Sequence, residues 1–370
     1  MALNDLFYQF RNRLLGSARF RRIAQKIPLI HRLANREAVA LFRVFSGYVH
    51  SQVMLACVRL GLIEMLRDGP LDVPDIATRA GTPVERTRHL LHAAAALEIL
   101  ERRPDGKFGL GRLGASMIDN PSVVAMVEHH AIFYEDLVDP VPLIRGTQTE
   151  TKMSRLWPYA TSAGPEALES ADVTNYTAFM AASQAMVAEQ VLEAFSFRDC
   201  RRLLDIGGGA GAFVIAVATQ WKHIHATVAD LPAVAEIATQ AIAAADLGDR
   251  LTAVSADATS DELPGGFDVV SLVRVLHDHD DDKVLDLLRT ARSAMADDGV
   301  LLVAEPMADA RVAGPLIDAY FQLYLLAMGS GRPRTTDELS TLFDEAGFGA
   351  PRHHQTSVPL ITSVLSAAPK

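Results

Sequence analysis

A short apolar run that leads into a glycine-rich loop constrains this chain more than any other feature. Residues 203–213 read LLDIGGGAGAF, with glycines at 207, 209 and 211 and a helix expected to start near Ala212. Glycine permits tight backbone turning and lets a ligand approach the main chain closely, as in the first strand-to-helix turn of nucleotide-binding α/β domains. The run therefore predicts an α/β domain with a ligand site at this turn.

Short runs of β-branched residues alternate with helical stretches from residue 201 onward. A helix is expected before them, over 176–195. The expected strands are RLLDIGG, HATVAD, LTAVSAD, FDVVSLV and VLLVAEP, followed by a hairpin between about 351 and 367. This alternation predicts a doubly wound parallel sheet, and residues 176–370 are the expected catalytic domain.

The first half of the chain has helical periodicity, and 370 residues usually divide into two domains. One helix ends at Gly61, and another is expected to start near Pro83 with Thr82 as its N-cap. Pro104-Asp105-Gly106 predicts a hairpin turn. Helix, turn, helix and hairpin is the order of a winged helix, expected within residues 41–175 after a separate segment over 1–40.

A winged helix can bind DNA, and the second helix here carries Arg86, Arg88, His89 and His92. From Leu90 to Leu100, however, the residues are mostly small and apolar. Specific DNA binding needs a basic face that touches many phosphates, so packing and homodimerisation are expected rather than nucleic-acid binding. A ligand-sensing transcription regulator is the non-enzyme alternative.

The N-terminal segment is strongly basic although the whole chain has a net charge of −10. Leu3, Leu6, Phe7, Phe10 and Leu14 recur at helical spacing. Such a helix could lie on an anionic membrane surface, but packing against a neighbouring domain or a partner chain is the stronger expectation. Residues 11–43 hold a single acid, Glu37, against nine cationic residues: Arg11, Arg13, Arg19, Arg21, Arg22, Lys26, Arg32, Arg36 and Arg43.

Cysteine and histidine positions argue against disulfides and metal sites. Cys57 and Cys200 lie far apart, and the paired histidines lack a ligand spacing with carboxylates. Asp280, Asp281 and Asp282 suit the start of a helix. Without a leader or about 18 uninterrupted apolar residues, a cytoplasmic location is expected, with peripheral contact at the inner membrane surface as the alternative.

Acidic residues and a histidine follow successive predicted strands. Asp230 ends the second strand, Asp257 follows the third, and VLHDHDDD at 275–282 follows the fourth. Carboxyl ends of parallel strands share one edge of a sheet, so these residues are expected to face one ligand. A nicotinamide dinucleotide would also suit the glycine loop and Asp230, which leaves an oxidoreductase as an alternative.

The sequence resembles the cation-independent, S-adenosylmethionine-dependent O-methyltransferases of small molecules, from about residue 40 to the end. The motifs are LLDIGGGAG, Asp230-Leu231-Pro232, Asp257, VLHDHDDD, LLVAEP and GSGRPRTTDELSTLFDEAGF. The Arg-rich leader, GYVHSQVMLACVRLGL, FMAASQ and AMGSGRPR are most similar to the bacterial hydroxycarotenoid branch. A neighbouring branch methylates carbon on bacteriochlorophyll precursors.

The resemblance implies methyl transfer from S-adenosylmethionine, with S-adenosylhomocysteine as product and no metal. It also implies His277 as the general base and Glu305 as the carboxylate that orients it. Many members have a second carboxylate beside this histidine, but its position here is Pro333. The implied cofactor-binding residues are Asp205, Gly207, Gly209, Asp230, Leu231, Asp257, Ala258 and Arg274.

The acceptor is expected to be a small hydrophobic molecule with a hydroxyl, a hydroxycarotenoid of carotenoid biosynthesis first among them. A bacteriochlorophyll precursor and an aromatic polyketide or phenol are the alternatives. Since an aliphatic alcohol has a pKa near water's ~15.7, far above that of histidine, its proton must leave as the methyl moves. Candidate pocket residues, which core packing explains almost as well, are Phe133, Phe179, Met180, Phe321, Tyr324 and Met328.

Overall fold

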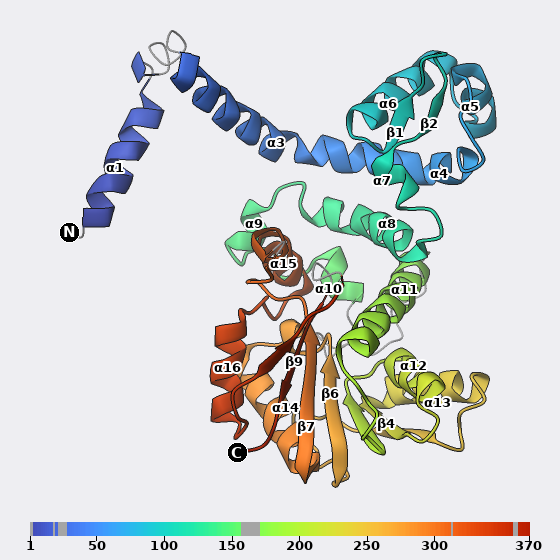
Figure 1. Cartoon of the computed structure of the whole chain (residues 1–370), viewed down its shortest axis with the longest axis vertical. Coiled ribbons are helices and arrows are strands. Elements are labelled where there is room, and N and C mark those ends of the chain that lie inside the picture. Colours follow the sequence, from blue (N-terminus) through green and yellow to red (C-terminus); the bar gives the residue numbers. More distant parts are fainter. Residues whose placement is uncertain (1–2, 18, 21–27, 157–170, 312–313, 358–361) are drawn as a thin grey trace. The chain divides into compact units, whose positions relative to one another are not determined.

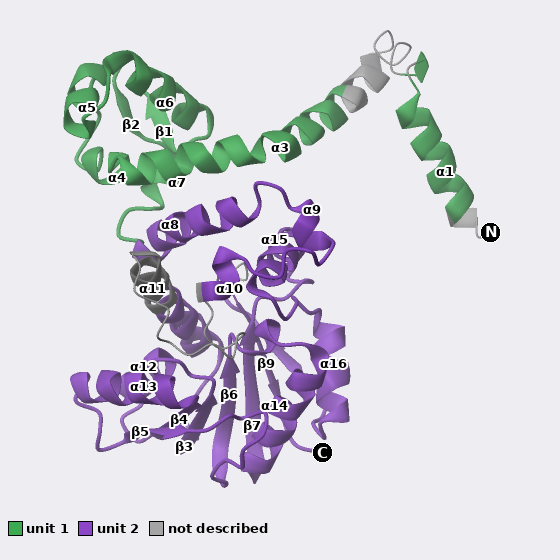
Figure 2. Cartoon of the chain, turned by 180° about the vertical axis from the view of Figure 1, so that it is seen from behind, with its two compact units in different colours: residues 1–120 green, residues 121–370 purple. Residues whose placement is uncertain are grey.

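The computed structural model describes residues 3–17, 19–20, 28–156, 171–311, 314–357 and 362–370 (Figure 1). The chain forms two compact units, Met1–Asn120 and Pro121–Lys370 (Figure 2). Their boundary lies earlier than the expected domain boundary at 175. The helices that follow Asn120 belong to the second unit because their apolar side chains pack against a later helix of that unit.

The first unit has the order of elements of a winged helix. Its described elements are α1 (Leu3–Gly16), α3 (Pro28–Arg59), α4 (Leu62–Met65), α5 (Val73–Ala80), α6 (Val84–Ala96), β1 (Leu100–Arg102), β2 (Phe108–Leu110) and α7 (Arg112–Ala115). Strands β1 and β2 pair antiparallel, as the Pro-Asp-Gly turn predicts. Gly81 ends α5 in the left-handed conformation, with a φ of 64°.

The start of α6 differs from the sequence-based expectation by one residue. Pro83, rather than Thr82, is the N-cap, and no side chain caps the helix. The Thr82 hydroxyl instead forms a 2.7 Å hydrogen bond with the Thr87 hydroxyl. Proline fixes its own φ near the helical value and has no N–H to satisfy, so the helix can begin directly after it.

Helix α3 includes a stretch, Asn35–Arg59, that is long and apolar enough to cross a membrane by length and composition alone. The large side chains on its exposed part include Phe42, Phe45 and Tyr48. The core helix of a soluble protein and a signal sequence pass the same test, so one such stretch does not establish a span.

The second unit contains a sheet with helices on both faces. Its described elements are α8 (Pro121–Asp136), α9 (Val141–Ile144), α10 (Lys152–Leu156), α11 (Ala171–Ala194), β3 (Arg202–Ile206), α12 (Ala212–Gln220), β4 (His225–Asp230), α13 (Pro232–Ala244), β5 (Leu251–Ser255), β6 (Phe267–Val273), the 3-10 turn η2 (Leu276–Asp278), α14 (Asp281–Ala294), β7 (Met295–Glu305), α15 (Gly314–Met328), α16 (Thr336–Glu345), β8 (Arg352–His354) and β9 (Ser363–Ala367).

The strand order is β5-β4-β3-β6-β7-β9-β8, so β3, which comes first along the chain in this sheet, lies in its interior. Strands β3 to β7 are parallel, β9 pairs antiparallel with β7, and the edge strand β8 pairs antiparallel with β9, so β8 runs in the direction of β3 to β7. The chain moves from β3 to one edge and returns to β6 on the other side of β3. Loops after β3 and β6 therefore diverge and leave a crevice at the carboxyl edge, where doubly wound sheets bind ligands.

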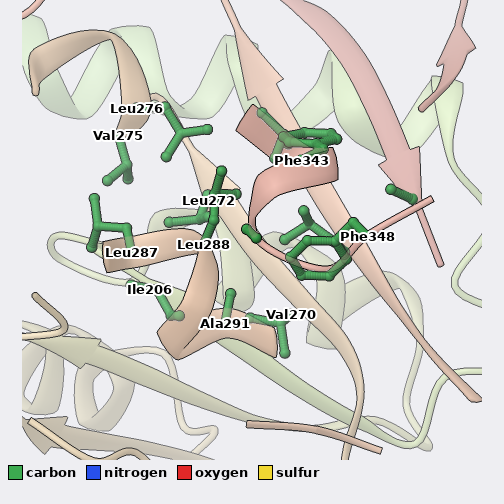
Figure 3. Packing of buried hydrophobic residues seen from close by; sticks show 14 of the residues in the cluster. Ile206, Val270, Leu272, Val275, Leu276, Leu287, Leu288, Ala291, Phe343 and Phe348 are labelled. Carbon is green, nitrogen blue, oxygen red and sulfur yellow. The ribbon is translucent and has the colours of Figure 1, made fainter. Parts of the chain in front are cut away.

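Two buried clusters fix the layers. Leu204 and Ile206 face a cluster with residues of α14 and α16, where Leu288 and Phe343 are buried (Figure 3). Leu203 points the other way, into a cluster with residues of α11, α12 and α13. Strand side chains alternate between faces, so a strand covered on both sides requires apolar residues at successive positions, as Leu203 and Leu204 are in β3.

Candidate active site

The loop after β3 presents bare backbone at the carboxyl edge of the sheet. Gly207, Gly209 and Gly211 have φ values of 67°, 57° and 79°, a region that glycine adopts without strain. A Cβ on Gly207 would lie 2.8 Å from a Val275 methyl group. Side chains are therefore excluded on geometric grounds, and the loop has the form that the methionine part of S-adenosylmethionine requires.

Asp205 lies beneath this loop rather than on it. Its side chain is fully buried, and Oδ1 accepts a 2.6 Å hydrogen bond from the Ser271 hydroxyl. A Cβ on Gly208 would lie 2.5 Å from Asp205 Oδ2. Burial raises the pKa of this carboxyl to about 7. With no exposed atom, Asp205 supports the loop from below, and its expected contact with the cofactor stays a prediction.

Asp230 joins the loops that follow β3 and β4. Its Oδ2 accepts a 2.8 Å hydrogen bond from Gly209 N, and its Oδ1 accepts one of the same length from Leu231 N. Burial raises the pKa of Asp230 although these two hydrogen bonds act against the rise. The carboxylate lies at the carboxyl end of its strand, where it can hold ribose hydroxyls.

The third acidic position follows β5. Asp257 Oδ1 accepts hydrogen bonds from the hydroxyl and backbone N of Thr259, at 2.7 and 2.9 Å, and the first of these holds the pKa of Asp257 below its usual value. Ala258 is almost fully buried among core residues, so adenine would meet mainly its backbone. The glycine loop, Asp230 and Asp257 thus follow three neighbouring strands and together fit an adenosyl group with a methionine tail.

His277 lies across the crevice, in the turn after β6. Its Nδ1 is 2.5 Å from Glu305 Oε2, and both side chains are buried. Glu305 ends β7, and its Oε1 accepts hydrogen bonds from Val275 N and Leu276 N at 2.8 and 2.7 Å. The carboxylate is thereby fixed in position by backbone, and it in turn fixes the imidazole ring.

A second carboxylate contacts His277, but it comes from a position that the sequence analysis did not single out. Asp278 Oδ1 lies 3.2 Å from His277 Nε2, and Asp278 is 7% exposed. Pro333, where the family resemblance places a second carboxylate, is buried and has none to offer. His277 and Asp278 are consecutive residues of the 3-10 turn η2, and the sequence analysis did not single out a contact between neighbours in the chain.

Both groups of this pair titrate away from their usual values. Burial lowers the pKa of His277, but the charges of Asp278 and Glu305 outweigh it, so the pKa is raised overall. Burial raises the pKa of the Asp278 carboxyl to about 6, although the His277 charge acts in the opposite direction. The ring is therefore a stronger base than an exposed histidine.

The loop that contains Pro333 contacts the backbone of the turn that carries His277. Arg334 is 3% exposed, and its guanidinium donates 2.7 Å hydrogen bonds to the carbonyl oxygens of Leu276 and His279. A Cβ on Gly331, whose φ is 82°, would lie 2.1 Å from the carbonyl oxygen of His277. These two residues were not predicted as site residues, although the GSGRPR run was noted.

An aromatic cluster borders His277. Phe133, Tyr324 and Met328 are buried together between α8 and α15, and their expected role in lining an acceptor pocket stays a prediction. The ring of Phe321 meets the His277 imidazole edge-on, with centroids 5.8 Å apart. Phe179 and Met180 lie in α11, but their side chains are outside the described residues. The cluster gives His277 an apolar neighbourhood on this side.

Arg274, expected in the cofactor pocket, has an unusual backbone conformation. It is a non-glycine residue with a φ of 57° directly after β6, and its backbone N donates to Ala304 O. Its positive charge acts to lower the pKa values of Tyr320 and Tyr324, although burial raises both overall. The same charge acts on His277 and Asp278, and the expected role of Arg274 in the cofactor pocket stays a prediction.

The acids that follow His277 have structural partners. Asp280 is the N-cap of α14, and Asp281 and Asp282 lie in its first turn, as expected. Asp281 forms ion pairs with Arg332 and Arg334. Within the described parts of the chain, no group of three or more His, Cys, Asp or Glu side chains could hold a metal ion.

Comparison with protein families identifies both halves of the chain. Residues 42–118 match the O-methyltransferase dimerisation domain, and residues 134–349 match the O-methyltransferase domain. The first match supports a homodimer and makes the regulator interpretation unnecessary.

Similar proteins agree with these matches. The chain is 39% identical over 355 residues to demethylspheroidene O-methyltransferase of Cereibacter sphaeroides, covering 96% of this chain and 93% of the relative. It is 37% identical to the enzyme of that name from Rhodobacter capsulatus, covering 97% and 89%. The solved structure of the S-adenosylmethionine-dependent methyltransferase SibL is 25% identical, with a TM-score of 0.77, covering 90% of this chain and 99% of SibL.

The glycine loop, the strand-end acids and His277 lie on a fold and a sequence that these proteins share, which excludes the nicotinamide alternative. The chain therefore belongs to the S-adenosylmethionine-dependent O-methyltransferase family, as an enzyme with an N-terminal dimerisation domain.

Proposed function

We propose that this enzyme methylates the hydroxyl group of a hydroxycarotenoid, with His277 as the general base and Glu305 as its orienting partner. The observation that carries the proposal is the His277 ring, held by Glu305 at Nδ1 and bordered by the aromatic cluster. The identity of 39% to a demethylspheroidene O-methyltransferase supports this acceptor class over phenols and bacteriochlorophyll precursors.

Glu305 sets the tautomer of the base. With both oxygens of Glu305 acting as acceptors, Nδ1 carries a proton and donates a hydrogen bond to the carboxylate. Nε2, which contacts Asp278 in this structure, is then the nitrogen that receives the proton of the acceptor hydroxyl. As this proton arrives, the ring becomes positive between Glu305 and Asp278. Each unit by which the carboxylates raise the pKa of His277 lowers the cost of proton transfer by about 1.4 kcal/mol.

The rest of the catalytic effect comes from positioning the cofactor and the acceptor hydroxyl. When bound, S-adenosylmethionine supplies an activated methyl group. The glycine loop, Asp230 and Asp257 would hold the cofactor, while Phe321 and the residues packed with it would exclude water and align the hydroxyl oxygen. Because the acceptor is an alcohol, the proton passes to Nε2 as the new C–O bond forms.

The raised pKa of His277 makes a prediction about pH. The enzyme is active when the imidazole is neutral, so kcat/KM should rise with pH, with a midpoint above the usual histidine value of about 6.5. Asp278→Asn removes a negative charge that favours the protonated ring and should move this midpoint to lower pH by about one unit. The measurement is the pH profile of kcat/KM for both proteins.

Asp282→Asn is the matched control, because Asp282 is an exposed acid in the first turn of α14. It should leave the midpoint unchanged. A midpoint that stays in place in Asp278→Asn as well would show that His277 is not the titrating base.

The acceptor class is tested by parallel product assays with labelled S-adenosylmethionine and a hydroxycarotenoid, a simple phenol or a bacteriochlorophyllide. The hydroxycarotenoid should be methylated with a kcat/KM at least about tenfold above the other two, since only a long apolar acceptor uses the whole aromatic cluster. Faster methylation of the phenol or the bacteriochlorophyllide would replace the proposed acceptor.

A further inference from the structure

Helix α1 carries an exposed apolar stripe, and two further exposed apolar side chains, Tyr8 and Leu15, lie beyond Arg11 on one side of it. Leu6, Phe7, Phe10 and Leu14 are 50%, 62%, 65% and 36% exposed. At 100° per residue these four positions fall within an arc of about 100° around the helix. Solvent-facing side chains of this size on one stripe indicate a surface that meets another apolar phase.

Two arginines border the stripe. By the same helical spacing, Arg11 follows Phe7 on one edge and Arg13 lies beside Leu6 on the other, each within about 40°. Asp5, Gln9 and Asn12 lie on the opposite side of the helix. A long arginine side chain can extend its methylene groups along apolar surface while its charge remains at a polar boundary.

The sequence around α1 adds a strong charge separation. Residues 11–43 carry nine cationic side chains and one acid, a net charge of +8, whereas the whole chain has −10. The remaining residues therefore carry −18. An anionic surface would attract this segment and repel the remainder of the enzyme, which favours contact through the segment alone.

Helix α1 precedes the part of the chain that the family uses for dimerisation. The dimerisation domain begins at residue 42, so it includes the exposed Phe42, Phe45 and Tyr48 of α3 but not the stripe of α1. The SibL structure covers 90% of this chain, so about a tenth of the chain has no counterpart in it. The Cereibacter relative leaves only about 15 residues unaligned, so it shares part of the segment before residue 42.

We infer that α1 binds the surface of an anionic phospholipid bilayer. Phe7, Phe10 and their neighbours insert at the level where headgroups meet acyl chains, and Arg11 and Arg13 lie among the phosphates. A helix with an apolar stripe and flanking cations binds such a surface through buried apolar area and charge together. The enzyme is then peripheral, held where hydrophobic molecules dissolve.

Sedimentation of the full-length protein with vesicles tests this inference without any need for turnover. Vesicles of phosphatidylcholine with about a third phosphatidylglycerol should bind the protein, whereas phosphatidylcholine alone should bind at least about tenfold less. High salt should release the protein from the anionic vesicles. Wild-type protein that stays in the supernatant with both kinds of vesicle would overturn the inference.

Variants separate the bilayer from a protein partner. The double variant Phe7→Ser, Phe10→Ser should bind the anionic vesicles at least about tenfold less than wild type. In the double variant Arg11→Gln, Arg13→Gln, vesicle binding should depend less on salt concentration. The matched control, Gln9→Ser with Asn12→Ser, changes the opposite face and should bind as wild type does. Light scattering should find all of them dimeric. A monomeric Phe7→Ser, Phe10→Ser variant would assign the stripe to the subunit interface instead.

Discussion

His277→Ala is expected to lower kcat by about 10²- to 10⁴-fold, because the reaction loses the group that accepts the hydroxyl proton. The dissociation constant for S-adenosylhomocysteine should change little, since the cofactor loops follow β3, β4 and β5, whereas His277 follows β6. Steady-state kinetics and calorimetry measure the two effects separately.

His279→Ala is the control for the first prediction. His279 lies two residues away in the same turn, and only its backbone oxygen accepts from Arg334. Its substitution should leave kcat within a few-fold of wild type. Equal turnover in wild type and His277→Ala would remove His277 from the proton transfer.

Gly331→Ala should also lower kcat, by about 100-fold, although Gly331 is not proposed to touch either substrate. The new Cβ would lie 2.1 Å from the carbonyl oxygen of His277 and must push the turn away. A displacement of about 1 Å at a catalytic group costs about this factor. Cofactor affinity should remain close to that of wild type.

Gly329→Ala separates displacement from backbone strain. Gly329 also has a positive φ, 102°, but nothing lies within 4 Å of a Cβ built there. This variant should lose stability and retain most of its kcat, measured by thermal unfolding and steady-state kinetics. A similar loss of kcat in both variants would mean that strain, and not contact with His277, explains the effect.

Features that depend on neighbouring residues could be predicted from the sequence. FDVVSLV and HATVAD have the bounds of β6 and β4, and α12 begins at Ala212 as expected. Each depends on a local pattern: an apolar β-branched run, or glycines that permit only one kind of turn. The C-terminal hairpin was also predicted, because its two short strands are close in sequence.

Features that depend on contacts between residues far apart in the sequence could not be predicted from it. The helices from Pro121 to Leu156 join the second unit through packing on α15, which periodicity does not reveal. Arg334 binds the turn at Leu276 across 58 residues of sequence, so nothing local marked it as part of the site. The contact of Asp278 with His277 was not predicted for a different reason: Asp278 is one of four acids in the run HDHDDD, and nothing local distinguishes it from the others.

Two of the predicted site residues have conformations that only the structure shows. Asp205 belongs to the glycine motif, yet strand alternation turns its side chain into the core beneath the loop. Arg274 adopts a left-handed backbone conformation directly after β6, which is uncommon for a residue other than glycine. Neither conformation follows from position along the chain.

The most direct test of the central claim is a single turnover with ¹³C-methyl S-adenosylmethionine and a hydroxycarotenoid, followed by NMR of the product. We predict a ¹³C-methoxy carotenoid, formed quickly by the wild-type enzyme and at least about 100-fold more slowly by His277→Ala. A labelled methyl group on carbon, or equal rates of methoxy formation in the two proteins, would contradict the account.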